Sequence, residues 1–568
     1  MSDTSAIAQD LHRTTPGGKR PGLLAQERTI AGAGFNRWFV PPAALAIHLC
    51  IGMAYGFSVF WLPMSKLVTH PDPRCPKSSH WTTDLFTTQC NWAVSSVAFT
   101  FTLFIVFLGL SAALWGGWLE RAGPRRAGVV AALCWCGGLV LGAVGVYAHQ
   151  LWIIWLGTGA LGGIGLGLGY ISPVSTLIKW FPDRRGMATG FAIMGFGGGA
   201  MIGAPLAALL MKYFAPGGAN GVGQTYLALA AIYLAFMLGG AFGYRVPASG
   251  WQPAGWTPPR AAATALITRR HVHLNQAWRT PQFWAIWGVL CLNVSAGIGV
   301  LAMASPMFQE VFGAKLLGAP LHAASPAGAA VNADQKAQIA IVAAGLVGLL
   351  SLFNILGRIF WASLSDRLGR KNTYYAFFII GLLCYCALPT FAHLGAVALF
   401  VASACLIMSM YGGGFATVPA YLADLFGTQM VGAIHGRLLT AWSVAGVIGP
   451  LLIANLREFE IARGVPPNLV YDVTLYCLAL LLLGGLICNI MVKPVAEKYQ
   501  MSDEQLQAER RLAHQTVAAA PLADAAPLAD AALPGTFGAG LVLAWVAVGV
   551  PFFWGVWTAV QKAAVLFR

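Results

Sequence analysis

Thirteen long apolar stretches, separated by short polar segments, run along this chain. Each contains about 20 predominantly apolar residues, enough to cross the hydrocarbon core of a bilayer as an α-helix. Lipid offers no hydrogen-bond partner to backbone N–H and C=O groups, so each stretch must satisfy its own, as a helix does. The sequence therefore predicts an all-α membrane protein. The approximate ranges are 40–61, 92–117, 126–147, 151–178, 187–212, 225–244, 282–305, 337–363, 373–393, 396–421, 438–456, 470–492 and 537–560.

The composition agrees with this class and indicates an orientation. Only 10% of the 568 residues are charged, against about 25% in soluble proteins. The net charge of +15 comes from basic residues scattered between the apolar stretches, which does not favour a nucleic-acid partner. With the N-terminus in the cytoplasm, about two thirds of the 35 Lys and Arg residues fall on the cytoplasmic side, as the positive-inside rule requires.

The spacing of the stretches divides the chain into six segments. The polar, basic segment in the middle reads as a linker between two bundles, and the repeat "APLADAAPLADAALP" reads as a flexible tether. We expect a cytoplasmic N-terminal tail (1–39), a six-helix bundle (40–244), a cytoplasmic linker (245–281), a second six-helix bundle (282–492), a flexible linker (493–536) and an extra transmembrane helix (537–568).

The two expected bundles share a sequence repeat. The segment "ALWGGWLERAGPRR" (113–126) aligns with "IFWASLSDRLGRKN" (359–372), so that Glu120 falls on Asp366 and Gly123 on Gly369. Halves related in this way are typical of secondary transporters, whose substrate site lies between the halves near the middle of the membrane.

The aligned turns each combine an acid, basic residues and a glycine. The acid can pair with a base or cap a neighbouring helix, so we expect these turns to close the cytoplasmic side of a transport path. The alternative is an ordinary charged turn. The residues are Glu120, Arg121, Gly123 and Arg125 in the first copy, and Asp366, Arg367, Gly369 and Arg370 in the second.

The chain has 11 Cys residues, and the first outer loop contains two of them. If this loop faces an oxidising compartment, Cys75 and Cys90 can form a disulfide. Two free thiols are the alternative. The sequence contains no metal-type CxxC pairs, so neither a metal nor another cofactor is expected.

The two aligned turns that contain Glu120 and Asp366 closely resemble the signature turn of the major facilitator superfamily. This resemblance implies two six-helix halves related by a pseudo-two-fold axis and transport by alternating access. Within that superfamily the chain resembles the oxalate:formate antiporter family from about residue 36 to 492. The segments that carry this resemblance are "NRWF", "FTL" with "GPR", "GYISPVSTLIKWFPDRRGMATGF", "RTPQFW", "SLFNILGRIFWASLSDRLGR" and "GGGFATVPAYLADLFG".

Arg358 is the charged residue that lies deepest in an apolar stretch. It precedes Asp366 by eight residues, about 12 Å along a helix, and no Asp or Glu occupies the centre of any predicted span. We infer that its counter-ion is an anionic cargo, since a guanidinium binds a carboxylate through two parallel hydrogen bonds. The alternative is an Arg satisfied by backbone carbonyls and water. The resemblance likewise implies that an Arg here binds the substrate carboxylate.

A second position departs from the family pattern. Relatives that carry oxalate have a Lys in the eleventh helix, and alignment through Gly436 places Trp442 there. A single positive charge compensates one carboxylate well and two poorly. The substitution therefore favours a monocarboxylate such as formate, lactate or pyruvate over oxalate.

Further candidate site residues are mainly aromatic. The resemblance places Tyr170, Tyr55, Tyr411 and Phe415 at pocket positions, where rings wall the apolar side of a small acid. Ordinary helix packing is the alternative for each of them. His48 is a possible proton site because histidine titrates near neutral pH; the alternative is a histidine that is hydrogen-bonded in place.

Together these features predict a secondary transporter of small carboxylate anions that works as a monomer in the bacterial cytoplasmic membrane. Anion exchange and proton-linked symport both remain open. A carrier of a sugar or drug is the alternative within transport, and a non-transport membrane protein is a weaker one. The sequence shows no catalytic constellation, so we do not expect an enzyme.

Overall fold

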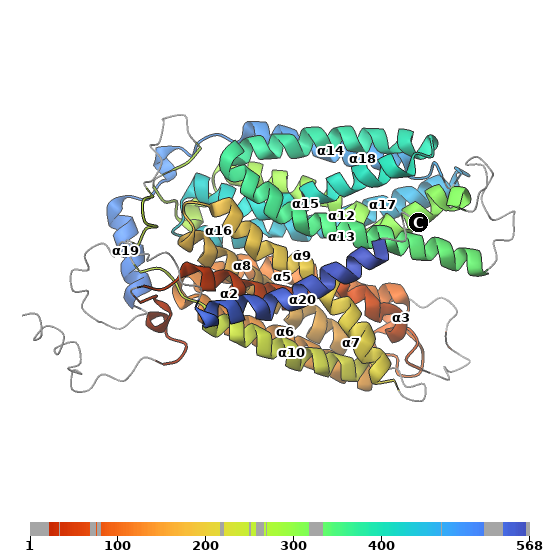
Figure 1. The fold of residues 1–568 in the computed structure, drawn as a ribbon, viewed down its shortest axis with the longest axis horizontal. Coiled ribbons are helices and arrows are strands. Elements are labelled where there is room, and N and C mark those ends of the chain that lie inside the picture. The colour runs from red at the N-terminus through yellow and green to blue at the C-terminus, as the bar shows by residue number, and fades with distance from the viewer. Residues whose placement is uncertain are drawn as a thin grey trace, which may run out of the picture.

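The protein is described by a computed structural model that covers residues 22–32, 34–68, 75, 81–215, 221–248, 251–256, 266–268, 270–316, 333–466, 468–515 and 538–563. Within these residues the chain forms helices joined by short connections (Figure 1). Among the described residues, thirteen helical spans are long and apolar enough to cross a membrane. The predicted all-α architecture is confirmed. Parts of the expected N-terminal tail, central linker, tether and C-terminal segment lie outside the described residues.

The first six spans form one half of the molecule, in red to yellow in Figure 1. The first span changes from an α-helix to a 3₁₀ segment, and the fourth contains a π-helical turn. The elements are α2 (Val40–Ile51), η3 (Gly52–Phe60) and α3 (Trp61–Met64); α5 (Val94–Ala122); α6 (Pro124–Tyr147); α7 (Leu151–Ile154), η4 (Trp155–Leu161) and α8 (Gly162–Trp180); α9 (Arg185–Tyr213); and α10 (Val222–Gly243).

The next six spans form the other half, in green to light blue. They are α12 (Pro281–Leu316), α13 (Ala333–Leu368), α14 (Arg370–His393), α15 (Val397–Phe426), α16 (Val431–Leu438) with α17 (Thr440–Ala462), and α18 (Asp472–Met491). Shorter elements are η1 (Gln26–Thr29), η2 (Arg37–Phe39), α4 (Trp81–Asp84), α11 (Leu274–Ala277), η6 (Glu497–Tyr499) and α19 (Asp503–Gln515).

The eleventh span differs most from its predicted range. It begins at Val431 rather than near residue 438, and Leu439 separates α16 from α17. The sequence of α16 is too polar to register as an apolar run. Its first turn is instead stabilised from outside the span, because the Glu120 carboxylate accepts a hydrogen bond from the Gly432 N–H.

The two halves meet mainly in two places. At one, α5 packs against α16 and α17, and at the other, α9 packs against α13 and α15. Glycines allow the close approach. A Cβ on Gly190 of α9 would lie 2.8 Å from the Arg358 carbonyl oxygen, and one on Gly116 of α5 would lie 2.9 Å from the Ala433 Cα. Small residues at such crossings bring the helix backbones together.

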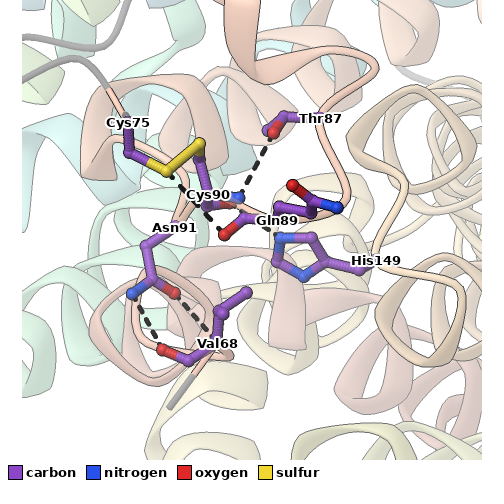
Figure 2. Close-up of a disulfide and its surroundings, with 7 residues drawn as sticks. All are labelled: Val68, Cys75, Thr87, Gln89, Cys90, Asn91 and His149. Carbon is purple, nitrogen blue, oxygen red and sulfur yellow. Dashed lines mark hydrogen bonds between the residues drawn. A yellow bond between two sulfur atoms is a disulfide. The ribbon is translucent and has the colours of Figure 1, made fainter. Parts of the chain in front are cut away.

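The two ends of the bundle are chemically different. We call the end that carries the described residues of segment 245–281 the linker face and the opposite end the disulfide face. At the disulfide face Cys75 and Cys90 form a disulfide, and the Cys90 carbonyl accepts a hydrogen bond from the His149 ring at 2.9 Å (Figure 2). Asn91 both donates to and accepts from the Val68 backbone, which fixes this end of the loop.

The thirteenth span, α20 (Ala539–Ala563), lies across both halves. It contacts α2 and α9 of the first half and α13 of the second, and Figure 1 shows it in dark blue crossing the front of the bundle. Phe552 packs against Gly198 of α9, where a Cβ would lie 3.1 Å from the ring. The extra helix therefore covers the α9–α13 contact from the lipid side.

Candidate functional site

Arg358 lies on α13 at the contact between the halves and is 1% exposed. Its Nη1 donates to the Ile193 carbonyl of α9 at 2.9 Å, and its Nε donates to the Asn354 side chain at 3.2 Å. Its Cζ lies 5.6 Å from the centre of the Phe415 ring, whereas Nη2 has no hydrogen-bond partner among the described residues. Within the described part of the chain, Arg358 forms no ion pair with a carboxylate.

The surrounding glycines explain how a guanidinium fits here. Gly197 of α9 lies against it, and a Cβ at that position would come within 2.8 Å of the Arg358 Nε. The glycine-rich run of α9 therefore makes room for the charged group. Any larger side chain at this position would push the guanidinium away from the neighbouring half.

Trp442 is the centre of an aromatic cluster beside Arg358. Its ring centre lies 4.6 Å from that of Phe415, 5.4 Å from that of Tyr170 and 6.2 Å from that of Tyr55. Phe196, which the sequence reasoning missed, lies 5.3 Å away. Tyr170, Tyr55 and Phe196 belong to the first half and the other two to the second, so the cluster spans the boundary between the halves.

Tyr55 and Tyr411 connect the halves on the disulfide-face side of Arg358. Their hydroxyl oxygens are 3.4 Å apart, and the Tyr411 ring lies 5.3 Å from Phe415. Tyr411 precedes Phe415 by one turn on α15, a helix that runs from the disulfide face to the linker face. The structure thus brings together all six residues that were predicted to bind substrate.

Several polar atoms in this region are buried without a hydrogen-bond partner. They are the Arg358 Nη2, the Tyr170 hydroxyl, the Trp442 Nε1 and both ring nitrogens of His435. The Arg358 and Trp442 atoms can only donate, and the Tyr170 hydroxyl can donate as well. A site whose free polar atoms are mostly donors suits a ligand that presents acceptor oxygens.

His48 is held by the backbone. Its Nδ1 contacts the Ala192 carbonyl, and its Nε2 lies 3.1 Å from the Tyr170 carbonyl. Both ring nitrogens face carbonyl oxygens, which only accept hydrogen bonds, so a neutral imidazole donates to one of them and a doubly protonated ring donates to both. Its ring also lies 5.4 Å from the Tyr170 ring, so it supports the wall of the aromatic cluster.

Asp366 links the halves at the linker face. Its carboxylate accepts hydrogen bonds from the Gly186 and Met187 N–H groups, at 2.8 and 3.0 Å, and so caps the first turn of α9. It also pairs with Arg370 at 2.6 Å. Asp424 extends the contact, because it pairs with Arg370 at 3.2 Å and with Arg185 of the first half at 2.9 Å.

Glu120 forms the corresponding contact from the first half to the second. It accepts from the Gly432 N–H at 3.1 Å, from the Ser175 hydroxyl at 3.1 Å, and pairs with Lys179 at 2.7 Å. Each repeated acid therefore caps a helix of the opposite half. The two halves are therefore joined by two such contacts at the linker face.

The glycines and the remaining arginines of the two turns do not take part in these contacts between the halves. Gly123 and Gly369 have φ values of +81° and +82°, a region that favours glycine and explains why both copies carry it. Arg125 is buried and donates to backbone carbonyls of Leu23 and Arg28 rather than to an acid. Arg121 and Arg367 are exposed.

A polar cavity of about 720 Å³ opens at the linker face and reaches this network. Asp366, Arg370, Asp424 and Arg185 contribute to its lining. Arg358 is almost fully buried behind the network, and the contact between Tyr55 and Tyr411 lies on its other side. The structure thus shows a buried central site with inter-half contacts on both sides.

His435 is the second residue that the sequence reasoning missed. The predicted span, 438–456, begins after it, so it was not considered as a site residue. A periodic argument would have found it, since it precedes Trp442 by seven residues, two helical turns, and so falls near the same helix face.

The comparisons with known proteins agree with this arrangement. Residues 44–450 match the model of the Major Facilitator Superfamily. The chain is 27% identical to the oxalate:formate antiporter of Oxalobacter formigenes over 424 residues, which cover 73% of this chain and 83% of the relative. It is 25% identical to apicoplast pyruvate carrier 1 of Toxoplasma gondii over 348 residues, 52% and 58% of the two chains.

The fold also matches solved structures. The proton:xylose symporter XylE superposes with a TM-score of 0.52 at 15% sequence identity, covering 83% of this chain and 98% of XylE. At that identity the match concerns the fold alone. With two six-helix halves, repeated signature turns and a family match over most of its length, the chain belongs to the major facilitator superfamily and, within it, resembles the oxalate:formate antiporter family.

Proposed function

We propose that the protein is a secondary transporter that binds small monocarboxylate anions at Arg358 and moves them across the membrane by alternating access. The observation that carries this proposal is the buried guanidinium, which has one free Nη2 and only neutral partners among the described residues. A charge at the centre of a membrane helix costs at least ~2.5–3.5 kcal/mol unless a partner or cavity compensates it. A cargo carboxylate supplies that partner.

The relatives' names support a carboxylate as the cargo. One is an oxalate:formate antiporter and another a pyruvate carrier, so both are named for small carboxylates. The aromatic cluster favours a singly charged cargo, because Trp442 packs against Phe415 where a second cation would be needed to compensate a dicarboxylate. The described residues of the site include no acid, which argues against a cationic drug.

Two sets of contacts between the halves support alternating access. The Asp366, Asp424 and Glu120 network joins the halves on the linker side of the site, and the Tyr55–Tyr411 contact joins them on the other side. Release of the cargo to one side requires one set to separate while the other holds. The halves then rock about the central site.

Exchange is the mode that the site favours. When the site is empty and closed, Arg358 remains buried without a counter-ion, whereas a bound carboxylate removes that penalty. The loaded protein therefore closes and reorients more readily than the empty one. Net one-way uptake is expected to be slow, and exchange of one anion for another fast.

We further propose that the linker face is cytoplasmic, that the membrane is the bacterial cytoplasmic membrane and that a monomer transports. The basic residues on that face support the orientation, as does the disulfide on the opposite face. One chain supplies both walls of the site, since Tyr170 and Trp442 come from different halves.

The test is uptake of labelled lactate, pyruvate, formate and oxalate into proteoliposomes, either empty or preloaded with the same acid. For the wild type we expect uptake of monocarboxylates that preloading raises about tenfold, the ratio that a difference of about 1.4 kcal/mol between the loaded and empty closed states produces. Arg358→Ala should abolish uptake, and Arg358→Lys should reduce it severely, because a Lys cannot form the paired hydrogen bonds.

Arg367→Lys is the matched control, since Arg367 lies on the same helix and is exposed. It should transport like the wild type. Unchanged uptake by both Arg358 variants would refute the assignment of the site. Equal uptake into empty and preloaded vesicles would refute exchange.

A further inference from the structure

A groove in the first half lies between three helices at the level of the membrane spans. It is lined by the first turns of α2, the last turns of α10 and the first turns of α20, which lie beside one another in Figure 1. Its volume is about 580 Å³, and small apolar residues line much of it, among them Ala43, Gly239 and Ala544. Phe236, another lining residue, is 39% exposed. The groove therefore opens toward the lipid.

Gly239 of α10 is the glycine that leaves this space open. Its neighbours Gly240 and Gly243 are explained by packing, since a Cβ would lie 2.6 Å from the Ala43 carbonyl oxygen at the first position and 3.1 Å from the Ala43 Cβ at the second. A Cβ on Gly239 would meet no described atom within 4 Å. Glycine destabilises the interior of a helix relative to alanine. Packing within the protein therefore gives no reason for Gly239, whereas a molecule lying in the groove does.

The groove is cationic at the linker face. Arg245 follows the end of α10 and, among the described residues, is the one charged residue that lines the groove. Its Nη1 donates to the backbone carbonyls of Phe242 and Tyr244, at 3.0 and 2.8 Å. It forms no ion pair with a carboxylate in the described part of the chain. Its positive charge is therefore available to an anion at this end of the groove.

A second guanidinium lies beside Arg245. Arg125 of α6 is 6% exposed, and its Nη2 donates to the same Phe242 carbonyl oxygen, at 3.5 Å. Its other hydrogen bonds go to the carbonyls of Leu23 and Arg28, and its Nε has no hydrogen-bond partner among the described residues. Two positive charges thus converge on one neutral oxygen, and no described carboxylate pairs with either. An anion beside Arg245 compensates both.

We propose that the groove binds one anionic phospholipid from the leaflet at the linker face. The phosphate pairs with Arg245, and one acyl chain extends past Gly239 toward the middle of the membrane. An acyl chain gains little by leaving other lipid for the groove, because lipid tails are as apolar as the lining. The headgroup therefore decides which lipid binds, and basic pockets between membrane helices select anionic headgroups. The inference does not depend on the proposed carboxylate transport.

Native mass spectrometry of the purified full-length protein in detergent is the test, with phosphatidylglycerol and phosphatidylcholine of identical acyl chains as probes. The two lipids have the same tails and differ in net charge. We expect the wild type to bind one phosphatidylglycerol with a dissociation constant about fivefold lower than that for phosphatidylcholine, the effect of one basic residue near a membrane surface. Arg245→Gln should remove this preference.

Arg279→Gln is the matched control for the charge, since Arg279 is an exposed arginine at the same face, two residues before α12. It should keep the preference for phosphatidylglycerol. Equal binding of the two lipids by the wild type, or an unchanged preference in Arg245→Gln, would overturn the assignment of the headgroup.

Gly239→Leu tests the path of the acyl chain. The new side chain enters the groove from a position where a Cβ meets no described atom, and leucine is a better helix former than glycine. The variant should therefore bind both lipids about fivefold more weakly or worse, while its unfolding temperature in lipid-free detergent stays at or above that of the wild type.

Gly137→Leu on α6 is the matched control for the added volume, because a Cβ there would make only an ordinary contact, 3.8 Å from the Leu161 side chain. It should bind both lipids like the wild type. Undiminished binding of phosphatidylglycerol by Gly239→Leu would overturn the location of the lipid. Arg358→Ala should bind both lipids normally, so failure of the proposed transport would leave these results unchanged.

Discussion

Asp424 and Arg358 are both buried, both charged and both located where the two halves meet, yet their partners differ. Asp424 at the linker face pairs with Arg185 and Arg370, one from each half. Arg358, deeper in the bundle, contacts a carbonyl, an amide and an aromatic ring. The charges at the linker face are neutralised within the protein and the central charge is not. We infer that the first set serves closure and the second serves the cargo.

The two repeated turns add a comparison within the linker face. Asp366 accepts two backbone N–H bonds from the opposite half and pairs with Arg370. Glu120 accepts one such bond, from Gly432, and pairs with Lys179. The turns occupy equivalent positions in the repeat but are unequally bonded. If these contacts serve closure as we propose, the copy in the second half should contribute more to it.

Asp424→Asn should produce the largest effect on the linker-face network. Removing one partner of a buried ion pair costs about 3–5 kcal/mol, and here Arg185 loses its acid partner while Arg370 keeps only Asp366. Because the closed linker face becomes rare, the exchange rate should fall about tenfold or more. Equilibrium binding of lactate, measured by a radioligand assay on purified protein, should stay within about threefold, since Arg358 is untouched.

Asp424→Glu, which keeps the charge, is the control and should retain most of the exchange rate. A variant that lost lactate binding in parallel with exchange would contradict the division between closure and cargo. In that case the two regions would act as one site.

Asp366→Asn and Glu120→Gln sharpen the comparison between the repeats. Glu120→Gln keeps an acceptor oxygen for the Gly432 N–H and loses the charge, whereas Asp366→Asn loses the charge and also one of its two acceptor oxygens, each of which accepts a backbone N–H. We expect Asp366→Asn to slow exchange about tenfold and Glu120→Gln only about threefold, because partly exposed pairs are worth about 1 kcal/mol or less. Exchange rates measured side by side decide the order, and a larger loss for Glu120→Gln would reverse it.

Trp442→Lys makes the centre of the bundle more highly charged and should change the selectivity of transport. A second cation near Arg358 compensates a second carboxylate, so the ratio of oxalate to lactate exchange should rise roughly fivefold, about 1 kcal/mol. Trp442→Gln, which adds a polar group without charge, is the control. An unchanged ratio in Trp442→Lys would argue against the role of charge in selecting monocarboxylates.

The membrane spans could be predicted from the sequence because the hydropathy of a segment depends only on the residues within it. The second span was expected at 92–117 and is Val94–Ala122, and the twelfth was expected at 470–492 and is Asp472–Met491. The positions of the repeated acids at the linker face, and the disulfide considered for Cys75 and Cys90, also appear in the structure. Each of these follows from a run, a repeat or a pair of cysteines that is visible in the chain.

The partners of the charged residues could not be predicted in the same way. Arg185 and Asp424 are 239 positions apart and meet only because α9 packs beside α13 and α15. The isolation of His435 depends on how α16 lies against α5, and the fixing of His48 depends on carbonyls of α8 and α9. Such contacts depend on which helices pack against one another. Hydropathy locates the helices in the sequence but does not show which of them are neighbours.

The most direct test of the central claim is competition binding to purified protein with labelled lactate. Lactamide has nearly the same shape as lactate but carries no charge. If Arg358 binds the cargo's carboxylate, lactate should compete at least about tenfold better than lactamide for the wild type, and Arg358→Ala should bind labelled lactate too weakly to measure. Equal competition by lactamide, or unimpaired lactate binding to Arg358→Ala, would show that the buried guanidinium does not bind the cargo.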